Sequence, residues 1–229
     1  MEKYLLIVLC WILLNPLQAL SQLKIIDVSG DVRVRWGIEE NWNEAGVGMV
    51  LRPEDSIQTG ESGVVVLQLK NGKTVKMTGN AYIDIIECRK ITEKEFFLAL
   101  ISEKVQNLKK QDKLKLEIGD VTVIHGDNRS QGNMPQKAQS NDLWRLELGG
   151  ADILDQHNMS MNAILKMKKI MRQYEPKDGG EIQYKIGAIF EKLGYSGHAQ
   201  EAFKRVIDGD WEQRWKDLAS SKIRHSQAK

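Results

Sequence analysis

Two short motifs in this 229-residue sequence have residue types that bind phosphate or attack a carbonyl carbon. The segment Asn71-Gly72-Lys73-Thr74 contains the Gly-Lys-Thr of a phosphate-binding loop. The first glycine of that motif would fall at Leu67, so the nest of backbone amides around a phosphate would be incomplete. The segment Gly194-Tyr195-Ser196-Gly197-His198 begins like a nucleophile elbow but ends in histidine, and a helix is expected before it where the elbow needs a strand. We therefore interpret the two motifs as a hairpin turn and a turn between helices.

Histidines and acidic residues are the remaining candidates for chemistry. No two of the histidines have the spacing of metal ligands on a helix; they are His125, His157, His198 and His225. No acidic segment has the pattern of a calcium-binding loop. The sequence predicts a protein that is not an enzyme and uses neither a metal nor a cofactor. The alternative is a hydrolase whose catalytic residues are dispersed along the chain.

The composition is that of a globular chain, with 28% charged residues and a net charge of +2 that is evenly spread. This charge is too small to predict a nucleic-acid partner. Residues 5–14 form an apolar run that ends at Asn15-Pro16, and small residues follow at Ala19 and Ser21. This pattern predicts a signal peptide over 1–21, because a membrane-spanning helix would need about 20 apolar residues. We expect an exported protein without a membrane span after cleavage.

Alternating apolar and polar residues, separated by turn residues, predict short strands in the first half of the chain. The expected strands are 23–28, 32–36, 56–59, 64–70, 74–78 and 81–87, with further strands at 113–118 and 121–125. Asn71-Gly72 predicts a hairpin with a type I′ turn, in which both central residues have positive φ. The polar segment 127–142 indicates a linker.

Residues 92–110 fit two structures. Thr92 and Glu95 have the spacing of a helical capping box, and Phe97 and Ile101 have helical spacing. Apolar residues also alternate from 96 to 100, which is typical of a strand.

From residue 143 the apolar period is helical. Small Gly187 and Ala199 are placed for the close approach of two antiparallel helices, and Gly194 lies between them. Ala163 corresponds to Ala199 at a distance of 36 residues, which indicates a helical repeat. Trp211, Trp215 and Leu218 are expected to form one apolar stripe on a last, capping helix.

The β half resembles the FecR-type domain, which occurs in periplasmic regions of bacterial regulators and in exported bacterial proteins. The matching motifs are Gly30-Asp31-Val32-Arg33-Val34, Asp55-Ser56-Ile57-Gln58-Thr59-Gly60 and the spacing Leu69, Gly72, Val75. The resemblance covers about 28–127. It implies a twisted, solenoid-like or sandwich-like stack of short strands in which 96–110 is also strand.

The helical half resembles tetratricopeptide repeats, with copies at about 144–177 and 180–209. Ile186-Gly187 stands where these repeats usually have Leu-Gly. Such repeats bind peptides or partner domains in a groove lined by the first helix of each repeat. Aligning Ala163 with Ala199 then places a mixed, mostly acidic set on the groove side: Arg145, Asp152, Asp155, Gln156, Glu181, Tyr184, Glu191 and Lys192.

Together these patterns predict a multidomain α+β protein. Its expected parts are a signal peptide (1–21), a FecR-like β domain (22–127), a linker (128–142) and a helical domain (143–229). We expect a periplasmic or secreted scaffold that binds a protein or peptide through its helices, with self-association left open because two repeats bury little core. The alternatives are a module that binds cell-wall glycan by stacking on Trp36 and Trp42, and a periplasmic signalling component.

Overall fold

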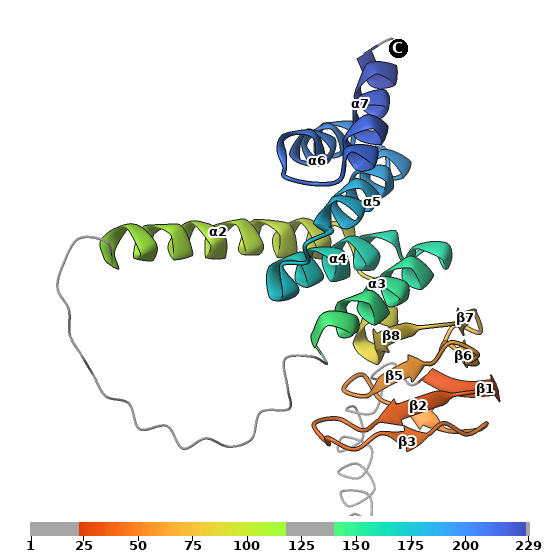
Figure 1. Ribbon diagram of the computed structural model, residues 1–229. Coiled ribbons are helices and arrows are strands. Elements are labelled where there is room, and N and C mark those ends of the chain that lie inside the picture. Colours follow the sequence, from red (N-terminus) through yellow and green to blue (C-terminus); the bar gives the residue numbers. More distant parts are fainter. Residues whose placement is uncertain (1–22, 118–139, 228–229) are drawn as a thin grey trace, which may run out of the picture. The chain divides into compact units, whose positions relative to one another are not determined.

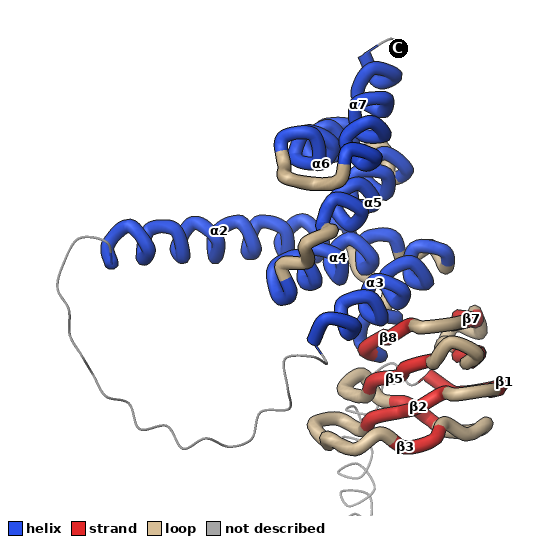
Figure 2. The backbone as a smooth tube through the Cα atoms, in the orientation of Figure 1, coloured by secondary structure: helices blue, strands red, loops and turns tan. Residues whose placement is uncertain are grey.

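A computed structural model describes residues 23–117 and 140–227 of the chain. The chain divides into two compact units, with the boundary between Arg89 and Lys90. All the described strands precede this boundary, and the described elements after it are helices (Figures 1 and 2). The expected two-part α+β organisation is confirmed at this level. The signal peptide expected over 1–21 lies outside the described residues.

The first unit, here called the β unit, consists of two four-stranded antiparallel sheets and a short 3-10 helix. The first sheet has the order β4-β1-β6-β7 and the second β3-β2-β5-β8. The strands are β1 (Leu23–Ser29), β2 (Val32–Arg35), β3 (Asn43–Glu44), β4 (Val50–Leu51), β5 (Ser56–Thr59), β6 (Val64–Gln68), β7 (Thr74–Thr78) and β8 (Ala81–Asp84), and the 3-10 helix η1 is Ile85–Cys88.

The alternation seen in the sequence becomes an inner and an outer face of each sheet. In the β6–β7 hairpin, Val65 pairs with Met77 and Leu67 with Val75, and all four side chains are buried. Val34 and Ile57 form a similar buried pair in the second sheet. Successive residues of a strand point to opposite faces, so the alternating apolar residues become the core of the unit.

The chain passes from one sheet to the other at five places, and three of these crossings are joined to one another by hydrogen bonds. We call residues 30–31, 60–63 and 79–80 the glycine corner. The amide of Gly60 donates to Asp31 (2.8 Å) and the amide of Gly79 donates to Gly63 (3.0 Å). A Cβ atom on Gly63 would lie 2.2 Å from the backbone oxygen of Asp31. Only glycine allows the two backbones to approach this closely.

The β6–β7 hairpin is confirmed, but its expected type I′ turn is wrong. The amide of Gly72 donates to Leu69 (2.9 Å), and the amide of Leu69 donates to Lys73 (2.8 Å). Gly72 has a φ of +77°, whereas Asn71 is not among the residues with positive φ. The loop is therefore a type I turn followed by one left-handed residue. The Asn71 side chain accepts a hydrogen bond from the Lys73 amide (3.0 Å), which favours this arrangement.

The second unit, here called the helical unit, begins with α2 (Glu93–Glu117). Of the two structures that residues 92–110 fit, the helix is the one observed, so the strand that the FecR resemblance implies over 96–110 is wrong. The strand expected over 113–118 is wrong as far as residue 117, and the one expected at 121–125 lies outside the described residues. The capping box explains where the helix starts: the Thr92 amide donates to the Glu95 carboxylate (2.7 Å), and the Glu95 amide donates to the Thr92 hydroxyl (3.2 Å). The β unit ends near residue 89, so it is shorter than the domain expected over 22–127.

Five further helices follow: α3 (Ser140–Gln156), α4 (Ser160–Tyr174), α5 (Gly179–Lys192), α6 (Ser196–Asp208) and α7 (Gln213–Gln227). The helix–turn–helix expected over 181–207 is confirmed. A Cβ on Gly187 of α5 would lie 2.6 Å from the Phe203 ring of α6, and Gly194 turns the chain between them with a φ of +83°.

The expected stripe on the last helix is wrong in two of its three members. Trp211 precedes α7 and packs against Gly179 and Gly180 at the start of α5, while Leu218 is 40% exposed. Trp215 is buried as expected.

Among the described helices, none combines the length and the apolar character needed to cross a lipid bilayer.

Candidate partner-binding site

A hollow of about 450 Å³ lies among α2, α4, α5 and α6 of the helical unit. Its lining combines apolar side chains with charged and polar ones, which we call its rim. The apolar lining residues are Phe97, Leu100, Ile101, Ile186, Phe190 and Ala202. The polar lining residues are Glu103, Lys104, Lys168, Gln183, His198, Glu201 and Arg205. Apolar cavities with a few polar groups at the edge are the usual form of binding sites.

An aromatic cluster fixes α2 beside α5 and α6 and so forms one wall of the hollow. Phe96 is fully buried, with its ring centroid 6.1 Å from that of Phe190. Phe97 makes an edge contact with Tyr195 at 5.2 Å, and His198 stacks on Phe190 at 5.1 Å. These separations are those of favourable aromatic pairs. The Tyr195 hydroxyl also donates a hydrogen bond to Glu93 at the start of α2, which raises the pKa of Tyr195.

The rim of the hollow carries one more cation than anion. Glu103 of α2 forms an ion pair with Lys168 of α4 (3.2 Å), and Arg205 forms one with Glu201 within α6 (2.6 Å). Lys104 remains, exposed and without an ion-pair partner among the described residues. The rim therefore has a net positive charge when His198 is neutral.

Three exposed apolar residues continue from the hollow along α2. Leu98 is 56% exposed, Ile101 58% and Val105 45%. Ile101 belongs both to this row and to the lining of the hollow. We call these three residues the α2 stripe. Their spacing of three and four residues places them on one face of the helix.

Four of the eight groove residues expected from the repeat alignment form ion pairs across the helices of the same unit, and Glu181 forms one within α5. Asp152 of α3 binds Lys185 of α5 (2.7 Å), and Asp155 of α3 binds Lys192 of α5 (2.9 Å). Burial alone would lower the pKa of Lys185, but the hydrogen bonds from Lys185 to Asp152 and to Glu181 outweigh it and raise that pKa.

The same row of contacts continues to α7, where Glu191 of α5 binds Lys222 (2.6 Å). This hydrogen bond is the main reason why the pKa of Lys222 is raised. Tyr184 lies between Phe203 and Trp215, with ring centroids 5.6 Å from each. The structure thus brings Asp152, Asp155, Glu181, Glu191 and Lys192 into inter-helix or intra-helix ion pairs.

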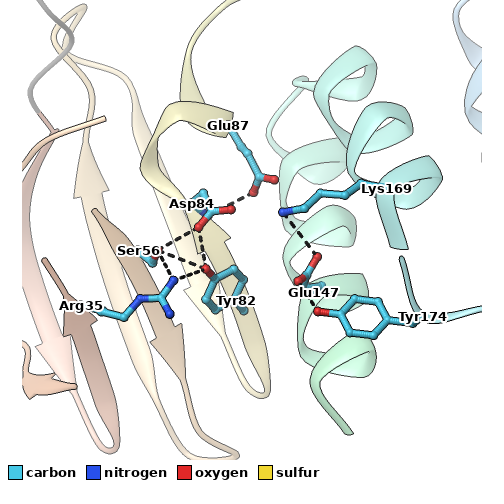
Figure 3. A network of polar contacts seen from close by, with 8 residues as sticks. All are labelled: Arg35, Ser56, Tyr82, Asp84, Glu87, Glu147, Lys169 and Tyr174. Atoms are coloured by element: carbon cyan, nitrogen blue, oxygen red, sulfur yellow. Dashed lines mark hydrogen bonds and ion pairs between the residues drawn. The ribbon is translucent and has the colours of Figure 1, made fainter. Parts of the chain in front are cut away.

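Besides Tyr184, two members of the expected set take no part in that row of ion pairs. The guanidinium of Arg145 lies over the ring of the adjacent Trp144, 4.5 Å from its centroid. Gln156 is exposed at the last residue of α3. A separate polar contact joins α3 to α4, because the Tyr174 hydroxyl donates to buried Glu147 (2.9 Å) (Figure 3).

The β unit contains a polar network beside the proposed glycan-stacking residue Trp42. Arg35 donates to the Tyr82 hydroxyl (3.0 Å), which donates to Asp84 (2.6 Å), and the Ser56 hydroxyl also donates to Asp84 (2.8 Å) (Figure 3). Burial and then the bond to Asp84 raise the pKa of Tyr82 far above its usual value.

Two members of this network, Arg35 and Tyr82, also lie against the ring of Trp42. The Arg35 guanidinium lies 5.2 Å from the centroid of the Trp42 ring, and Tyr82 meets the same ring edge-on at 6.1 Å. No ring contact joins Trp36 to Trp42 in the part of the chain that the structure describes. A sugar that stacks on Trp42 would have to use the ring face that Arg35 leaves open.

Within residues 23–117 and 140–227, no group of three or more histidine, cysteine or acidic side chains is arranged to hold a metal ion. No family model, no curated protein and no solved structure matches the chain.

The sequence patterns did not predict the hollow. Helical spacing of Phe97 and Ile101 is visible in the sequence, but their neighbours on α5 and α6 lie more than 80 residues further along the chain.

Proposed function

We propose that this chain is a non-enzymatic binding protein, and that its helical unit accepts apolar side chains of a partner polypeptide in the hollow between α2, α4, α5 and α6. The observation that carries the proposal is a hollow of about 450 Å³ whose six apolar lining residues include the solvent-exposed side chain of Ile101. Burying such surface against a partner supplies the main driving force of most protein association.

The charged groups around the hollow support binding rather than catalysis. Both rim carboxylates, Glu103 and Glu201, are held in ion pairs with basic side chains, and His198 stacks on Phe190. A general acid or base must be free to reach the proton that it transfers on a substrate. Here the charged groups instead surround an apolar depression, as they do in the polar rim of a protein interface.

The same reasoning favours the hollow over the face formed by α3, α5 and α7. The acidic residues of that face already bind lysines of neighbouring helices, so a basic peptide would have to compete with Lys185, Lys192 and Lys222. The features of residues 1–21 support the further proposal that binding takes place in the periplasm or outside the cell.

The test uses peptides selected from a random phage-displayed library on the purified full chain. Their affinities are then measured for two variants with the same chemistry, Ile101→Asp at the hollow and Leu218→Asp on α7. Both side chains are exposed, at 58% and 40%, so both variants should fold, which circular dichroism checks. We expect Ile101→Asp to weaken binding by about tenfold or more, because an apolar contact is lost. Leu218→Asp should bind as the parent does.

Two results would overturn the proposal. One is a library that yields no binding peptide. The other is a set of selected peptides whose affinity is the same for Ile101→Asp as for the parent chain.

A further inference from the structure

The α2 stripe extends the hollow into a longer apolar surface. Leu98, Ile101 and Val105 are each about half exposed, and Ile101 connects the row to the lining of the hollow. An isolated exposed apolar residue needs no explanation, but a contiguous row beside a cavity indicates an interaction surface. A partner of the helical unit would therefore meet both features at once.

The spacing of the stripe fits a helix better than an extended peptide. Positions 98, 101 and 105 follow the 3-4 spacing of the contact seam of a two-helix coiled coil. In such a seam a side chain of one helix inserts between four residues of the other. An extended peptide that binds by strand addition would instead need a free sheet edge, which a surface made of helices does not offer.

The charge beside the α2 stripe indicates whether the partner is acidic or basic. Lys104 stands next to Val105 at the rim, exposed and without an ion-pair partner among the described residues. Counted over the whole helix, the sequence of α2 holds six lysines and five acidic residues. Flanking charges of a helical seam set partner choice.

From these observations we infer that the occupant is an acidic amphipathic helix of a partner protein, which lies along α2 with its apolar face on Leu98, Ile101 and Val105 and one side chain in the hollow. This inference rests on the proposed function and names the partner's chemistry.

Two other occupants fit the surface less well. A second copy of this chain would bring Lys104 near a surface with the same net positive rim, and like charges across a seam repel. An anionic membrane would match the lysines, but a membrane surface cannot fill a hollow with a single protruding side chain. Both occupants are outcomes of the test below.

The probes are three designed peptides of three heptads each. The first has leucine at the seam positions and glutamate at most others. The second replaces each glutamate with lysine. The third has the composition of the first with leucine at alternate positions, which disfavours an amphipathic helix. Binding to the full chain is measured by fluorescence anisotropy, and the chain variants are Ile101→Asp, Lys104→Glu and, as a matched control, Lys177→Glu in the exposed loop before α5.

We expect the acidic helical peptide to bind most tightly. Ile101→Asp should weaken this binding by about tenfold or more. Lys104→Glu should weaken it by about fivefold and strengthen binding of the lysine peptide, while Lys177→Glu should have no effect. The effect of Lys104→Glu should shrink at high salt.

The outcomes separate this inference from the proposed function. If the lysine peptide or the alternating peptide binds at least as tightly and is sensitive to Ile101→Asp, the acidic helix is wrong while the hollow remains a binding site. If no peptide shows binding that depends on Ile101, both proposals fail. Dimerisation in sedimentation that Ile101→Asp abolishes, or flotation with phosphatidylglycerol vesicles that it abolishes, would assign the surface to a second copy or to a membrane and overturn the acidic partner.

Discussion

The two units of this chain bring distant segments together in different ways. In the β unit, backbone meets backbone: at the glycine corner, Gly63 lies so close to Asp31 that a Cβ atom would be 2.2 Å from its carbonyl oxygen. In the helical unit, side chain meets backbone: at Gly187, the nearest atoms are those of the Phe203 ring. Backbone cannot move without breaking the hydrogen bonds of both sheets, whereas a ring can shift. We therefore expect the β unit to tolerate change at its contacts less well than the helical unit.

The largest effect is expected for Gly63→Ala. The added methyl group would overlap backbone that is fixed by the bonds between Gly60, Asp31 and Gly79. We expect a loss of more than about 3 kcal/mol in the free energy of unfolding. Hydrogen exchange followed by mass spectrometry would detect it as lost protection over β1 to β8, with the helical unit unchanged. Gly46→Ala, which meets only the flexible Met49 side chain, is the control. Equal protection in both variants would contradict the close approach.

Gly187→Ala tests the corresponding contact between α5 and α6. The methyl group would lie 2.6 Å from the Phe203 ring, which must move. We expect a cost of about 1–3 kcal/mol, seen as faster exchange in α5 and α6 alone. Gly197→Ala on α6, where nothing lies within 4 Å of the new atom, should be neutral or slightly stabilising. A cost for Gly187→Ala larger than that for Gly63→Ala would reverse the comparison between the units.

Gly72→Val separates backbone strain from steric overlap. No atom lies within 4 Å of a Cβ at this position, but the φ of +77° is unfavourable for a β-branched residue. We expect a cost of about 1–2 kcal/mol, measured by chemical denaturation. Gly72→Asn should cost less, because asparagine adopts left-handed conformations more readily. An equal cost for the two variants would mean that the conformation of the turn is not the cause.

Asp152→Asn examines the face formed by α3, α5 and α7. Lys185 loses one partner but keeps Glu181 at 3.0 Å, and both groups of the lost ion pair are partly exposed. We expect a change in stability below about 1 kcal/mol. Binding of the selected peptides should not change. If Asp152→Asn abolishes their binding without changing stability, while Ile101→Asp leaves binding intact, this face rather than the hollow would be the peptide site.

Tyr82 should have the smallest effect at neutral pH and a growing one in alkali. Its pKa in the folded chain is raised, whereas that of an unfolded tyrosine is about 10. Above pH 10 the unfolded state therefore releases a proton that the folded state keeps, so stability falls as pH rises. Denaturation curves of the parent chain should decline more steeply above this pH than those of Tyr82→Phe. Parallel curves would contradict the burial of this hydroxyl.

Local signals account for the parts of the fold that the sequence predicts well. The bounds expected for residues 56–59 and 74–78 are those of β5 and β7, because alternation and turn residues act within a few positions. The segment 92–110 could not be settled in this way. Its helical form depends on the capping box at Thr92 and also on the packing of Phe96 against Phe190, a contact across 94 residues.

The site was harder to predict than the fold for a related reason. Apolar residues at 97, 101 and 105 show a helical face but do not show which helix covers it or whether it stays exposed. The acidic residues expected in a groove were correctly placed on α3 and α5, yet the lysines that bind them, Lys185 and Lys222, were not considered. A pattern of one charge sign cannot predict ion pairs whose partner lies a repeat away.

The glycine corner also bears on how the β unit acquires its structure as the chain emerges during synthesis. Its hydrogen bonds join residues 31, 60, 63 and 79–80, so three crossings between the sheets are tied to one another. A nascent chain that ends before Asn80 lacks β8, so β5 has no neighbour on that side, and the bond from the Asn80 amide to Gly60 is missing. The unit should therefore form late and in one step, as expected when native contacts lie far apart in sequence.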